Sequence, residues 1–325
     1  MSAPVALLEV ADLVKRYQGR GWRPRRRTVY ALNGVSFSIA AGETLGVVGE
    51  SGSGKSTLGR VVVRLAEADG GSVRFEGTEV RSLPRRALRA LRRRIQMIFQ
   101  DPSGSLNPRM RVGEAVGEGL EIHRLGSRRD REARVRQLFE EVGLDPVYAD
   151  RYPHQLSGGQ RQRVGIARAL AVDPTFLVCD EPVSALDVSV QAQVLNLLKQ
   201  LQRRRGLTFL FIAHDLAVVR QLAHRIAVLY FGRIVELGRT ETLVRNPRHP
   251  YTRALLSAVP SPDPERQASR IVLEGEPPRP THLPPGCPFF SRCFHPPKSA
   301  RCTTELPLLR PVGESMVACH YAESS

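Results

Sequence analysis

A strand-like run, a glycine-rich loop and a helix-like segment follow one another after residue 43 of this chain. The loop covers residues 49–56, reads Gly-Glu-Ser-Gly-Ser-Gly-Lys-Ser, and has the spacing G-x-x-x-x-G-K-S. Glycines let backbone N–H groups curl around an anion without Cβ clashes, and the following helix points its positive end at the same anion. A glycine-rich turn before a helix is the alternative, but the flanking strand and helix favour a nucleotide-phosphate site.

The last residues of the loop carry the groups that phosphate chemistry requires. Lys55 is placed to reach the β- and γ-phosphates, and the Ser56 hydroxyl is a ligand for Mg²⁺. We therefore expect a set of loop residues to bind the nucleotide: Gly49, Ser51, Gly52, Ser53, Gly54, Lys55, Ser56 and Thr57.

A second motif places two carboxylates at the end of an apolar run, where residues 176–181 read Phe-Leu-Val-Cys-Asp-Glu. The carboxyl end of a parallel strand opens onto the ligand crevice of an α/β sheet. There Asp180 would hold Mg²⁺ through water, and Glu181 would polarise the attacking water. Two acids that merely cap a loop are the alternative, but a phosphate loop in the same chain favours the catalytic interpretation.

Strand-like and helix-like segments alternate along the chain, which predicts a parallel α/β core. The expected strands are Leu7–Val14, Val35–Ile39, Thr44–Val48, Ile95–Phe99, Phe176–Cys179, Phe209–Ile212 and Ile226–Tyr230. From Asp101 to about Ala171 the pattern is helical and charged, which predicts an inserted helical subdomain. After Pro260 the chain is proline-rich. We expect an ATPase domain over residues 1–260 and an irregular Cys-rich extension over residues 261–325.

The net charge of +16 comes almost entirely from arginine. The basic runs Arg23–Arg27 and Arg85–Arg94 contain no aromatic residues, so they do not favour single-stranded nucleic acid, and we expect no nucleic-acid partner. No run of about 18 apolar residues is present to span a bilayer. Residues 1–9 also lack a basic segment before an apolar run, so we expect a cytoplasmic chain.

Residues 156–160 read Leu-Ser-Gly-Gly-Gln and precede the acidic strand. Together with the phosphate loop, this segment resembles the signature of ABC transporter ATP-binding subunits, and the resemblance extends from near the start of the chain to about Pro260. It implies the ABC-type P-loop NTPase fold with a helical subdomain. It also implies a second ABC ATPase subunit, packed head to tail, whose ATP site is completed by Ser157 and Gly159.

The resemblance implies roles for further residues. Gln100 matches the glutamine that contacts Mg²⁺ and the attacking water, and His214 matches the histidine that contacts the γ-phosphate. With Glu181 they form the expected catalytic set. Residues 184–187 match the loop that faces the second subunit. Tyr17 matches the aromatic residue that stacks on adenine, and Tyr30 is an alternative.

Four segments resemble the oligopeptide and dipeptide importers, namely residues 100–109, 152–155, 183–193 and 246–252. The third is most similar to the second of the two ATPase subunits of these importers. The resemblance implies two transmembrane permease subunits, a paralogous ATPase partner and an extracytoplasmic substrate-binding protein. It places the chain as a peripheral protein on the cytoplasmic face of the inner membrane. Importers of nickel or glutathione share much of this pattern.

Two other classes are alternatives to an importer ATPase. A soluble ABC ATPase of translation or DNA repair would agree with the positive charge, but such proteins usually carry two cassettes or a long coiled-coil or zinc insertion. A non-catalytic regulatory subunit is disfavoured by the intact Glu181 and His214.

Four cysteines, Cys287, Cys293, Cys302 and Cys319, lie near the end of the chain. Four thiolates suit Zn²⁺ or an iron–sulfur cluster, although no Cys-x2-Cys pair is present. Some peptide importers carry a [4Fe–4S] cluster on such a tail, so the resemblance favours the cluster over zinc or free thiols, with His295 and His320 as alternative ligands. We expect a structural cluster that orders a tail without a core of its own, while ATP binding stays with the separate ATPase core.

Overall fold

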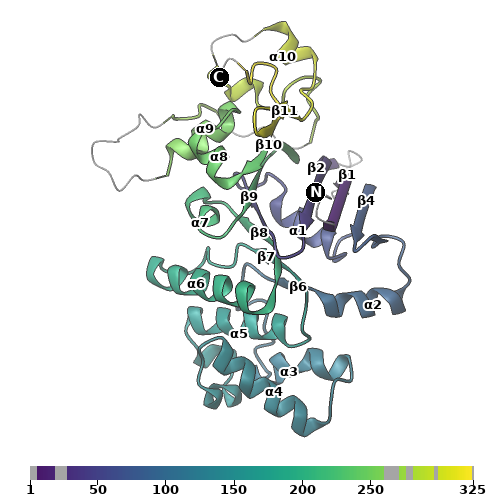
Figure 1. Cartoon of the computed structure of the whole chain (residues 1–325), viewed down its shortest axis with the longest axis vertical. Helices are drawn as coiled ribbons and strands as arrows, with labels where there is room; N and C mark the ends of the chain where they lie inside the picture. Colours follow the sequence, from purple (N-terminus) through teal and green to yellow (C-terminus); the bar gives the residue numbers. More distant parts are fainter. Residues whose placement is uncertain (1–5, 19–27, 260–270, 276–280, 296–298, 324–325) are drawn as a thin grey trace, which may run out of the picture. The chain divides into compact units, whose positions relative to one another are not determined.

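The computed structural model describes residues 6–18, 28–259, 271–275, 281–295 and 299–323 (Figure 1). The chain divides into two compact units. The first comprises Met1–Ile39, Thr44–Arg81 and Ala213–Ser325, and the second comprises Ala40–Glu43 and Ser82–Ile212. The basic run Arg23–Arg27 and the predicted boundary at Pro260 lie outside the described residues.

The first unit contains strands from two sheets. A separate antiparallel sheet has the order β2-β1-β4-β5, and the strands of the main sheet follow in the order β11-β12-β10-β9-β3. Only β3 and β9 pair in parallel there; β9, β10, β12 and β11 pair antiparallel. The strands are β1 (Ala6–Gln18), β2 (Thr28–Ala40), β3 (Thr44–Val48), β4 (Gly70–Phe75), β5 (Thr78–Glu79), β9 (Arg225–Tyr230), β10 (Arg233–Arg239), β11 (Arg310–Val312) and β12 (Ser315–Val317).

Short helices accompany these strands. They are α1 (Lys55–Val62), α7 (Leu216–Arg220), α8 (Thr240–Arg245), α9 (Pro250–Ser257), the 3-10 turn η4 (Phe290–Arg292) and α10 (Ala300–Thr304). Helix α7 packs tightly on β3, because a Cβ atom on Gly46 would lie 2.1 Å from the side chain of Val219. The strand that leads into the phosphate loop is therefore fixed from the side by α7.

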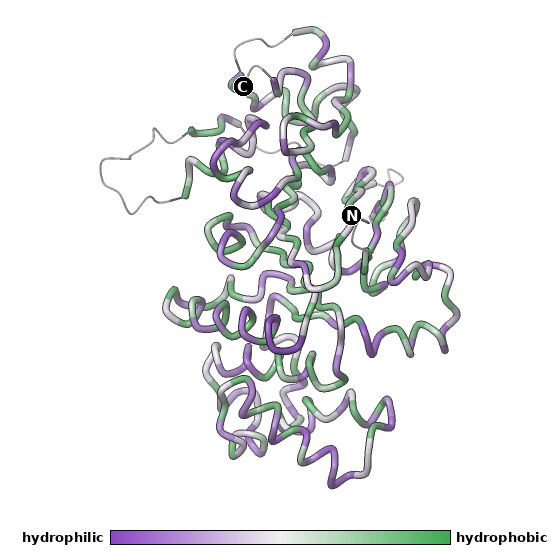
Figure 2. The backbone as a smooth tube through the Cα atoms, in the orientation of Figure 1, coloured by the Kyte–Doolittle hydropathy of each residue, from purple (hydrophilic) through white to green (hydrophobic). Residues whose placement is uncertain are grey.

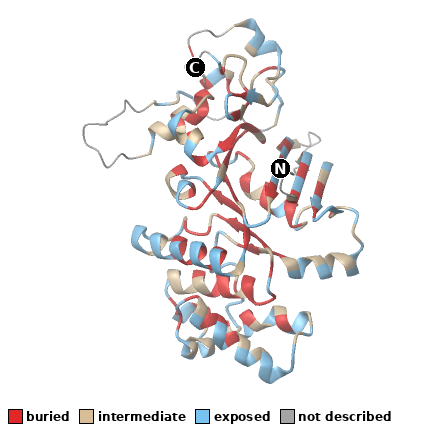
Figure 3. Ribbon diagram, viewed as in Figure 1, coloured by how far each residue is buried: buried red, intermediate tan, exposed pale blue. Residues whose placement is uncertain are grey.

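The second unit contains three parallel strands in the order β8-β7-β6. They are β6 (Ile95–Ile98), β7 (Phe176–Asp180) and β8 (Thr208–Ala213). Every residue of β7 and β8 is buried, as the red ribbons in Figure 3 show. Parallel strands covered on both faces read as continuous apolar runs, which is why the sequence identified them.

Most helices of the second unit occur in the sequence between strands β6 and β7. They are α2 (Arg85–Arg94), α3 (Val112–Ile122), α4 (Arg128–Glu141), η1 (Pro146–Asp150), η2 (Pro153–Gln155), α5 (Gly158–Leu170) and α6 (Val188–Arg205). Buried Val116, Leu138, Phe139 and Val164 form the apolar interior of α3, α4 and α5. Figure 2 shows hydrophilic and hydrophobic residues alternating along these helices. Residues 101–171 contain no strand, in line with the expected helical insertion.

The C-terminal extension is more ordered than we expected. Its described part forms the hairpin β11–β12, and β12 joins the main sheet by pairing Val317 with Glu236 of β10. Val312, Val317 and Ala322 form a small core of their own. The expectation of a tail without a core is therefore wrong for these residues. Two strands of three residues, one with a proline and separated by a tight turn, are too short for a periodic signal.

A buried carboxylate on β10 fixes the chain that follows α8. Glu236 is fully buried, and its oxygens accept hydrogen bonds from the N–H groups of Arg248 (3.0 Å) and His249 (2.9 Å). His249 in turn begins α9, because its Nδ1 atom accepts a hydrogen bond from the N–H of Tyr251 (3.0 Å). Burial raises the pKa of Glu236, and these N–H donors act in the opposite direction. The start of α9 thus depends on one side chain of the sheet.

Within the described ranges, no helix has the length and hydrophobicity needed to cross a membrane.

We predict that Glu236→Ala weakens the start of α9. The substitution removes the acceptor of the buried His249 N–H and of the partly buried Arg248 N–H, which costs about 2–4 kcal/mol. Hydrogen exchange of the amides in residues 248–254 should accelerate by at least about ten-fold. Glu241→Ala, which removes an exposed carboxylate from α8, is the matched control and should leave that segment protected. Equal exchange in both variants would contradict the role of Glu236.

Candidate nucleotide site and thiol pocket

The phosphate loop connects β3 to α1 within the first unit, as the sequence predicted. Lys55 is buried, and its Nζ atom donates to the carbonyl oxygens of Gly49 (2.7 Å) and Glu50 (2.9 Å). The ammonium group therefore lies inside the curve of the loop. From there it can exchange carbonyl oxygens for the phosphate oxygens of a nucleotide.

Two glycines of the loop meet neighbouring backbone so closely that no side chain fits. A Cβ atom on Gly54 would lie 2.3 Å from the carbonyl oxygen of Ala31, and Gly54 has a left-handed φ of +107°. A Cβ atom on Gly49 would lie 2.2 Å from the carbonyl oxygen of Leu229. The hydroxyl oxygen of Ser53 is buried, with no hydrogen-bond partner among the described residues. An orphaned hydroxyl beside a buried ammonium suits an anionic ligand.

The other predicted residues of the first unit lie in the loop, at the start of α1, or on the strands β1 and β2. Ser51 and Gly52 belong to the loop, and Ser56 and Thr57 belong to the first turn of α1. Tyr17 lies near the end of β1 and is 40% exposed.

Tyr30 lies on the neighbouring strand β2, so both candidate adenine-stacking residues belong to the same sheet. Each ring already has a cation nearby, with Lys15 Nζ 5.0 Å from the Tyr17 centroid and the Arg16 guanidinium 5.5 Å from that of Tyr30.

His214, the predicted contact of the γ-phosphate, directly follows β8 and is exposed.

The second unit brings together two of the three predicted catalytic residues. Asp180 ends β7 and is buried, and Glu181 follows it with its N–H bonded to the carbonyl oxygen of Ile212 in β8 (2.9 Å). The Gln100 amide donates to the Glu181 carboxylate across 3.1 Å. Glu181 adopts a positive φ of 45°, a region that costs a non-glycine residue about 1–3 kcal/mol. Such strain commonly marks a side chain held for function.

The signature segment begins helix α5. Ser157 is its N-cap, and the Ser157 hydroxyl and the Gln160 side chain each accept the other residue's backbone N–H in a capping box. Gly159 lies against α6, since a Cβ atom there would lie 2.6 Å from Val190. Asp187 caps α6 through the N–H of Val190 (2.9 Å). Ser157 itself is exposed, so it is available to another chain.

Family comparisons agree with these motifs. Residues 32–184 match the model of the ABC transporter family, and residues 235–302 match the oligopeptide/dipeptide transporter C-terminal region. A Brucella ovis protein named as a peptide import ATP-binding protein is 53% identical over 306 residues, 94% of each chain. The di/tripeptide transport ATP-binding protein DppF of Pseudomonas aeruginosa is 48% identical over 318 residues, 98% of each chain. The chain belongs to the ABC transporter ATP-binding family.

Solved structures give the same family. A dimeric ATP-binding cassette in a post-hydrolysis state, bound to ADP and phosphate, is 32% identical with a TM-score of 0.65 and covers 72% of this chain and 98% of its own. A component of a Clostridium perfringens ABC transporter complex is 26% identical with a TM-score of 0.64 and covers 74% of this chain and 91% of its own. The predicted ABC-type fold and ATPase class are thereby confirmed.

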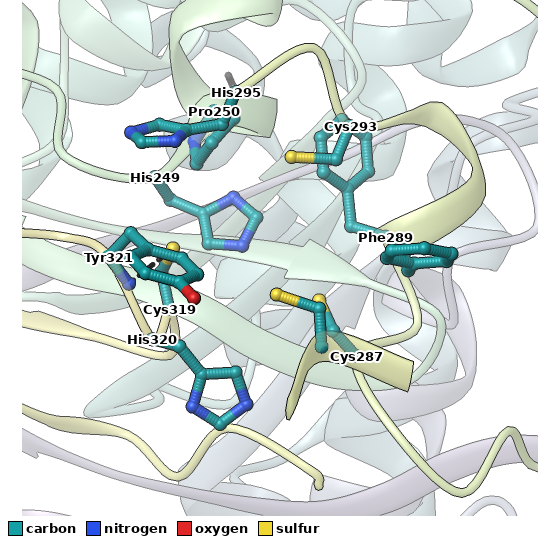
Figure 4. A pocket seen from close by; sticks show the side chains of 11 residues that line it. His249, Pro250, Cys287, Phe289, Cys293, His295, Cys319, His320 and Tyr321 are labelled. Carbon is teal, nitrogen blue, oxygen red and sulfur yellow. Dashed lines mark hydrogen bonds between the residues drawn. The ribbon is translucent and has the colours of Figure 1, made fainter. Parts of the chain in front are cut away.

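The C-terminal extension of this ABC ATPase gathers its four cysteines around one pocket. Cys287, Cys293, Cys302 and Cys319 all line a cavity of about 20 Å³, together with His249, His295 and His320. Figure 4 shows the labelled cysteine sulfurs turned toward a space bordered by His249 and Tyr321. Burial raises the pKa of Cys287 to about 12. In the described part of the chain, no group of three or more Cys, His, Asp or Glu residues has the arrangement of a metal site.

The fifth cysteine is a core residue. Cys179 is fully buried in β7, and burial raises the pKa of its thiol, which keeps it uncharged.

We predict that Gly54→Ala weakens ATP binding of the full chain by at least ten-fold. The new methyl group would press on the Ala31 carbonyl oxygen and strain the left-handed backbone, which distorts the loop around Lys55. The measurement is a titration with a fluorescent ATP analogue.

The matched control is Gly77→Ala in the β4–β5 turn. Its φ of +75° is also left-handed, but a Cβ atom there has nothing within 4 Å. We expect this variant to lose stability by about 1 kcal/mol and to keep its affinity for ATP. If both variants bind ATP equally well, the geometry of the loop does not govern binding.

Proposed function

We propose that this chain is the ATPase subunit of an ABC importer that energises the uptake of oligopeptides or dipeptides. The observation that carries the proposal is the peptide-transporter C-terminal region beside an intact phosphate loop and catalytic carboxylate. The relatives reported above carry peptide-transport names over nearly the whole chain. They give no support to a translation or repair ATPase, or to nickel or glutathione as the cargo.

The proposed chemistry is in-line attack of water on the γ-phosphate. Lys55 binds the β- and γ-phosphates, and Glu181 takes up the proton of the attacking water. Ser56, Gln100 and Asp180 would hold Mg²⁺, which neutralises phosphate charge when bound. The Gln100 amide also orients the Glu181 carboxylate through their hydrogen bond. His214 contacts the γ-phosphate, and Tyr17 stacks on adenine.

We further propose that two ATPase subunits complete each other's sites. Ser157 and Gly159 of one subunit close over the nucleotide of the other, a role that suits the exposed position of Ser157 at the start of α5. A related cassette is a dimer with ADP and phosphate bound. By the resemblance of residues 183–193, the partner is a paralogue.

The remaining partners and the domain boundaries are also proposals. The ATPase pair would bind two permease subunits on the cytoplasmic face of the inner membrane, with an extracytoplasmic substrate-binding protein delivering the cargo. Residues 1–260 would form the ATPase domain, with its helical subdomain at about 101–171, and residues 261–325 the extension. The ABC transporter match to residues 32–184 lies within the proposed ATPase domain, and the peptide-transporter match to residues 235–302 spans the proposed boundary.

We predict that Glu181→Gln in the reconstituted complex keeps ATP binding and lowers the turnover number by about 10²–10⁴-fold, because the general base is lost. Lys55→Ala should instead weaken ATP binding itself. Phosphate release and uptake of a labelled dipeptide into proteoliposomes are measured together. Normal turnover in Glu181→Gln would refute the catalytic assignment, and normal turnover without peptide uptake would refute the cargo.

The thiol pocket is proposed to hold a metal centre with a structural role. Four thiols and three imidazoles line one cavity, and thiolate and imidazole groups are suitable donors for a [4Fe–4S] cluster or for Zn²⁺. The cavity of about 20 Å³ has room for little more than one water-sized group. A cluster would therefore require the thiols to move apart, whereas a single Zn²⁺ ion requires less movement.

We predict that protein purified without oxygen contains iron and acid-labile sulfide at roughly four each per chain, as a four-thiolate [4Fe–4S] centre requires. Cys302→Ser should remove the brown colour and make the tail more sensitive to proteolysis, since metal binding contributes folding free energy. Cys179→Ser, which alters a thiol outside the pocket, should keep the metal. Stoichiometric zinc without iron would favour the zinc alternative, and no metal at all would leave four free thiols.

A further inference from the structure

The second residue of the phosphate loop is held by the C-terminal part of the chain. The N–H of Glu50 donates to the hydroxyl oxygen of Tyr251 across 2.8 Å. The Glu50 carboxylate accepts two hydrogen bonds from the Arg292 guanidinium, at 2.6 and 3.1 Å. These partners are 201 and 242 residues away in the sequence, and all three residues belong to the first unit.

This ion pair is shielded from solvent, unlike most surface pairs. The side chain of Arg292 is 7% exposed and that of Glu50 is 29% exposed. A guanidinium that faces a carboxylate through two parallel bonds fixes both orientation and distance. An exposed pair contributes about 0–1 kcal/mol, but a largely buried one leaves an uncompensated charge when one partner is removed.

The turn that carries Arg292 is anchored by the aromatic packing of Phe289, the residue before the turn. Arg292 ends this turn, η4, and Phe289 is almost fully buried. The Phe289 ring contacts those of Tyr230, Tyr251 and His249, with centroids 5.2, 5.5 and 5.6 Å away. Tyr251 thus contacts the loop directly and also supports the segment that carries Arg292.

The same segment builds the thiol pocket. Arg292 immediately precedes Cys293, and the N–H of Cys287 donates to the carbonyl oxygen of Cys302 (2.8 Å). A Cβ atom on Gly286 would lie 2.4 Å from the Cys302 carbonyl oxygen, so the two stretches of backbone pack directly together. The expectation that the extension is separate from the phosphate loop is therefore wrong. The segment from Cys287 to Cys293 both lines the thiol pocket and places Arg292.

The contact has two consequences at the loop. The carbonyl oxygen of Glu50 accepts a hydrogen bond from the Lys55 ammonium, so the position of Glu50 affects that of the ammonium. The Glu50 carboxylate is also a negative charge beside a site for phosphates, and the Arg292 guanidinium neutralises it. Loss of Arg292 would therefore both loosen the loop and expose phosphates to a repelling charge.

We propose that Arg292 is a positioning residue of the phosphate loop, through which the folding of the C-terminal extension controls the affinity for ATP. The proposal concerns ATP binding alone and does not depend on the transported cargo.

The test is ATP affinity of the full-length chain, measured by titration with a fluorescent ATP analogue. Arg292→Gln should raise the dissociation constant by about ten-fold or more, as loss of a charge-assisted pair beside a phosphate site implies. If repulsion by Glu50 is part of the effect, affinity for ATP should fall more than affinity for AMP, and the loss should grow as the salt concentration is lowered.

A double variant tests whether Arg292 acts on ATP binding through Glu50 or only stabilises the fold. Glu50→Gln removes the unpaired carboxylate, so the double variant with Arg292→Gln should regain ATP affinity to within about three-fold of the wild type. Arg301→Gln is the matched control, because it breaks an exposed ion pair with Glu305 in the same extension. It should leave ATP affinity unchanged.

The outcomes are distinct. Unchanged ATP affinity in a folded Arg292→Gln chain would overturn the proposal. A loss that equals the loss for AMP, and that Glu50→Gln does not rescue, would reduce Arg292 to a structural residue and also overturn it. A wild-type chain that binds ATP but hydrolyses none would count against the proposed function only. Thermal unfolding of each variant confirms that the chain titrated is folded.

Discussion

A buried ammonium group needs acceptors, and the phosphate loop is built around that requirement. Lys55 finds its acceptors in the carbonyl oxygens of Gly49 and Glu50, which converge only while the loop keeps its curve. The curve in turn needs Gly54, where the backbone is left-handed and too close to β2 for a side chain. The loop is therefore held in an anion-binding shape before any anion arrives, so little ordering cost remains for binding.

The support behind the loop forms a chain of buried polar groups. Glu236 on β10 holds the N–H of His249, His249 begins α9, and α9 presents Tyr251 to the N–H of Glu50. Arg292 contacts Glu50 through its side chain. Glu236 and His249 are buried, the Arg292 side chain is 7% exposed, and each residue of the series donates to or accepts from the next, so these polar groups restrain one another. The C-terminal extension is thus part of the structure that shapes the loop.

The motifs of this protein can be predicted from short stretches of sequence, but the contacts between distant residues cannot. The phosphate loop, the strand that ends in Asp180 and Glu181, and the capped helix at Ser157 each occupy a short stretch with its own periodicity or spacing. The proximity of Gln100 to Glu181 could be expected only from the family resemblance, because 81 residues separate them. The Arg292–Glu50 pair joins an arginine outside any motif to a variable position of the phosphate loop, in a chain that holds 48 lysine and arginine residues.

The expectation that the C-terminal extension lacks a core failed for a related physical reason. Proline-rich sequence and two three-residue strands give no periodic signal, and β12 is held by pairing with β11 and β10 and by packing of Val317 in a small core. Strand β12 therefore depends on tertiary contacts and cannot be predicted from local sequence.

A carboxylate in a phosphate site also raises a question of charge. Glu50 lies where an unpaired negative charge would weaken the binding of polyphosphate, yet Arg292 offsets it from the protein side. A neutral residue at position 50 would need no such partner, and the loop would then be independent of the extension. The glutamate–arginine pair makes the loop's charge, and not only its shape, depend on where residues 287–293 lie. Cys287 and Cys293 of this segment also line the thiol pocket, so the backbone that places Arg292 is the backbone that forms the pocket wall.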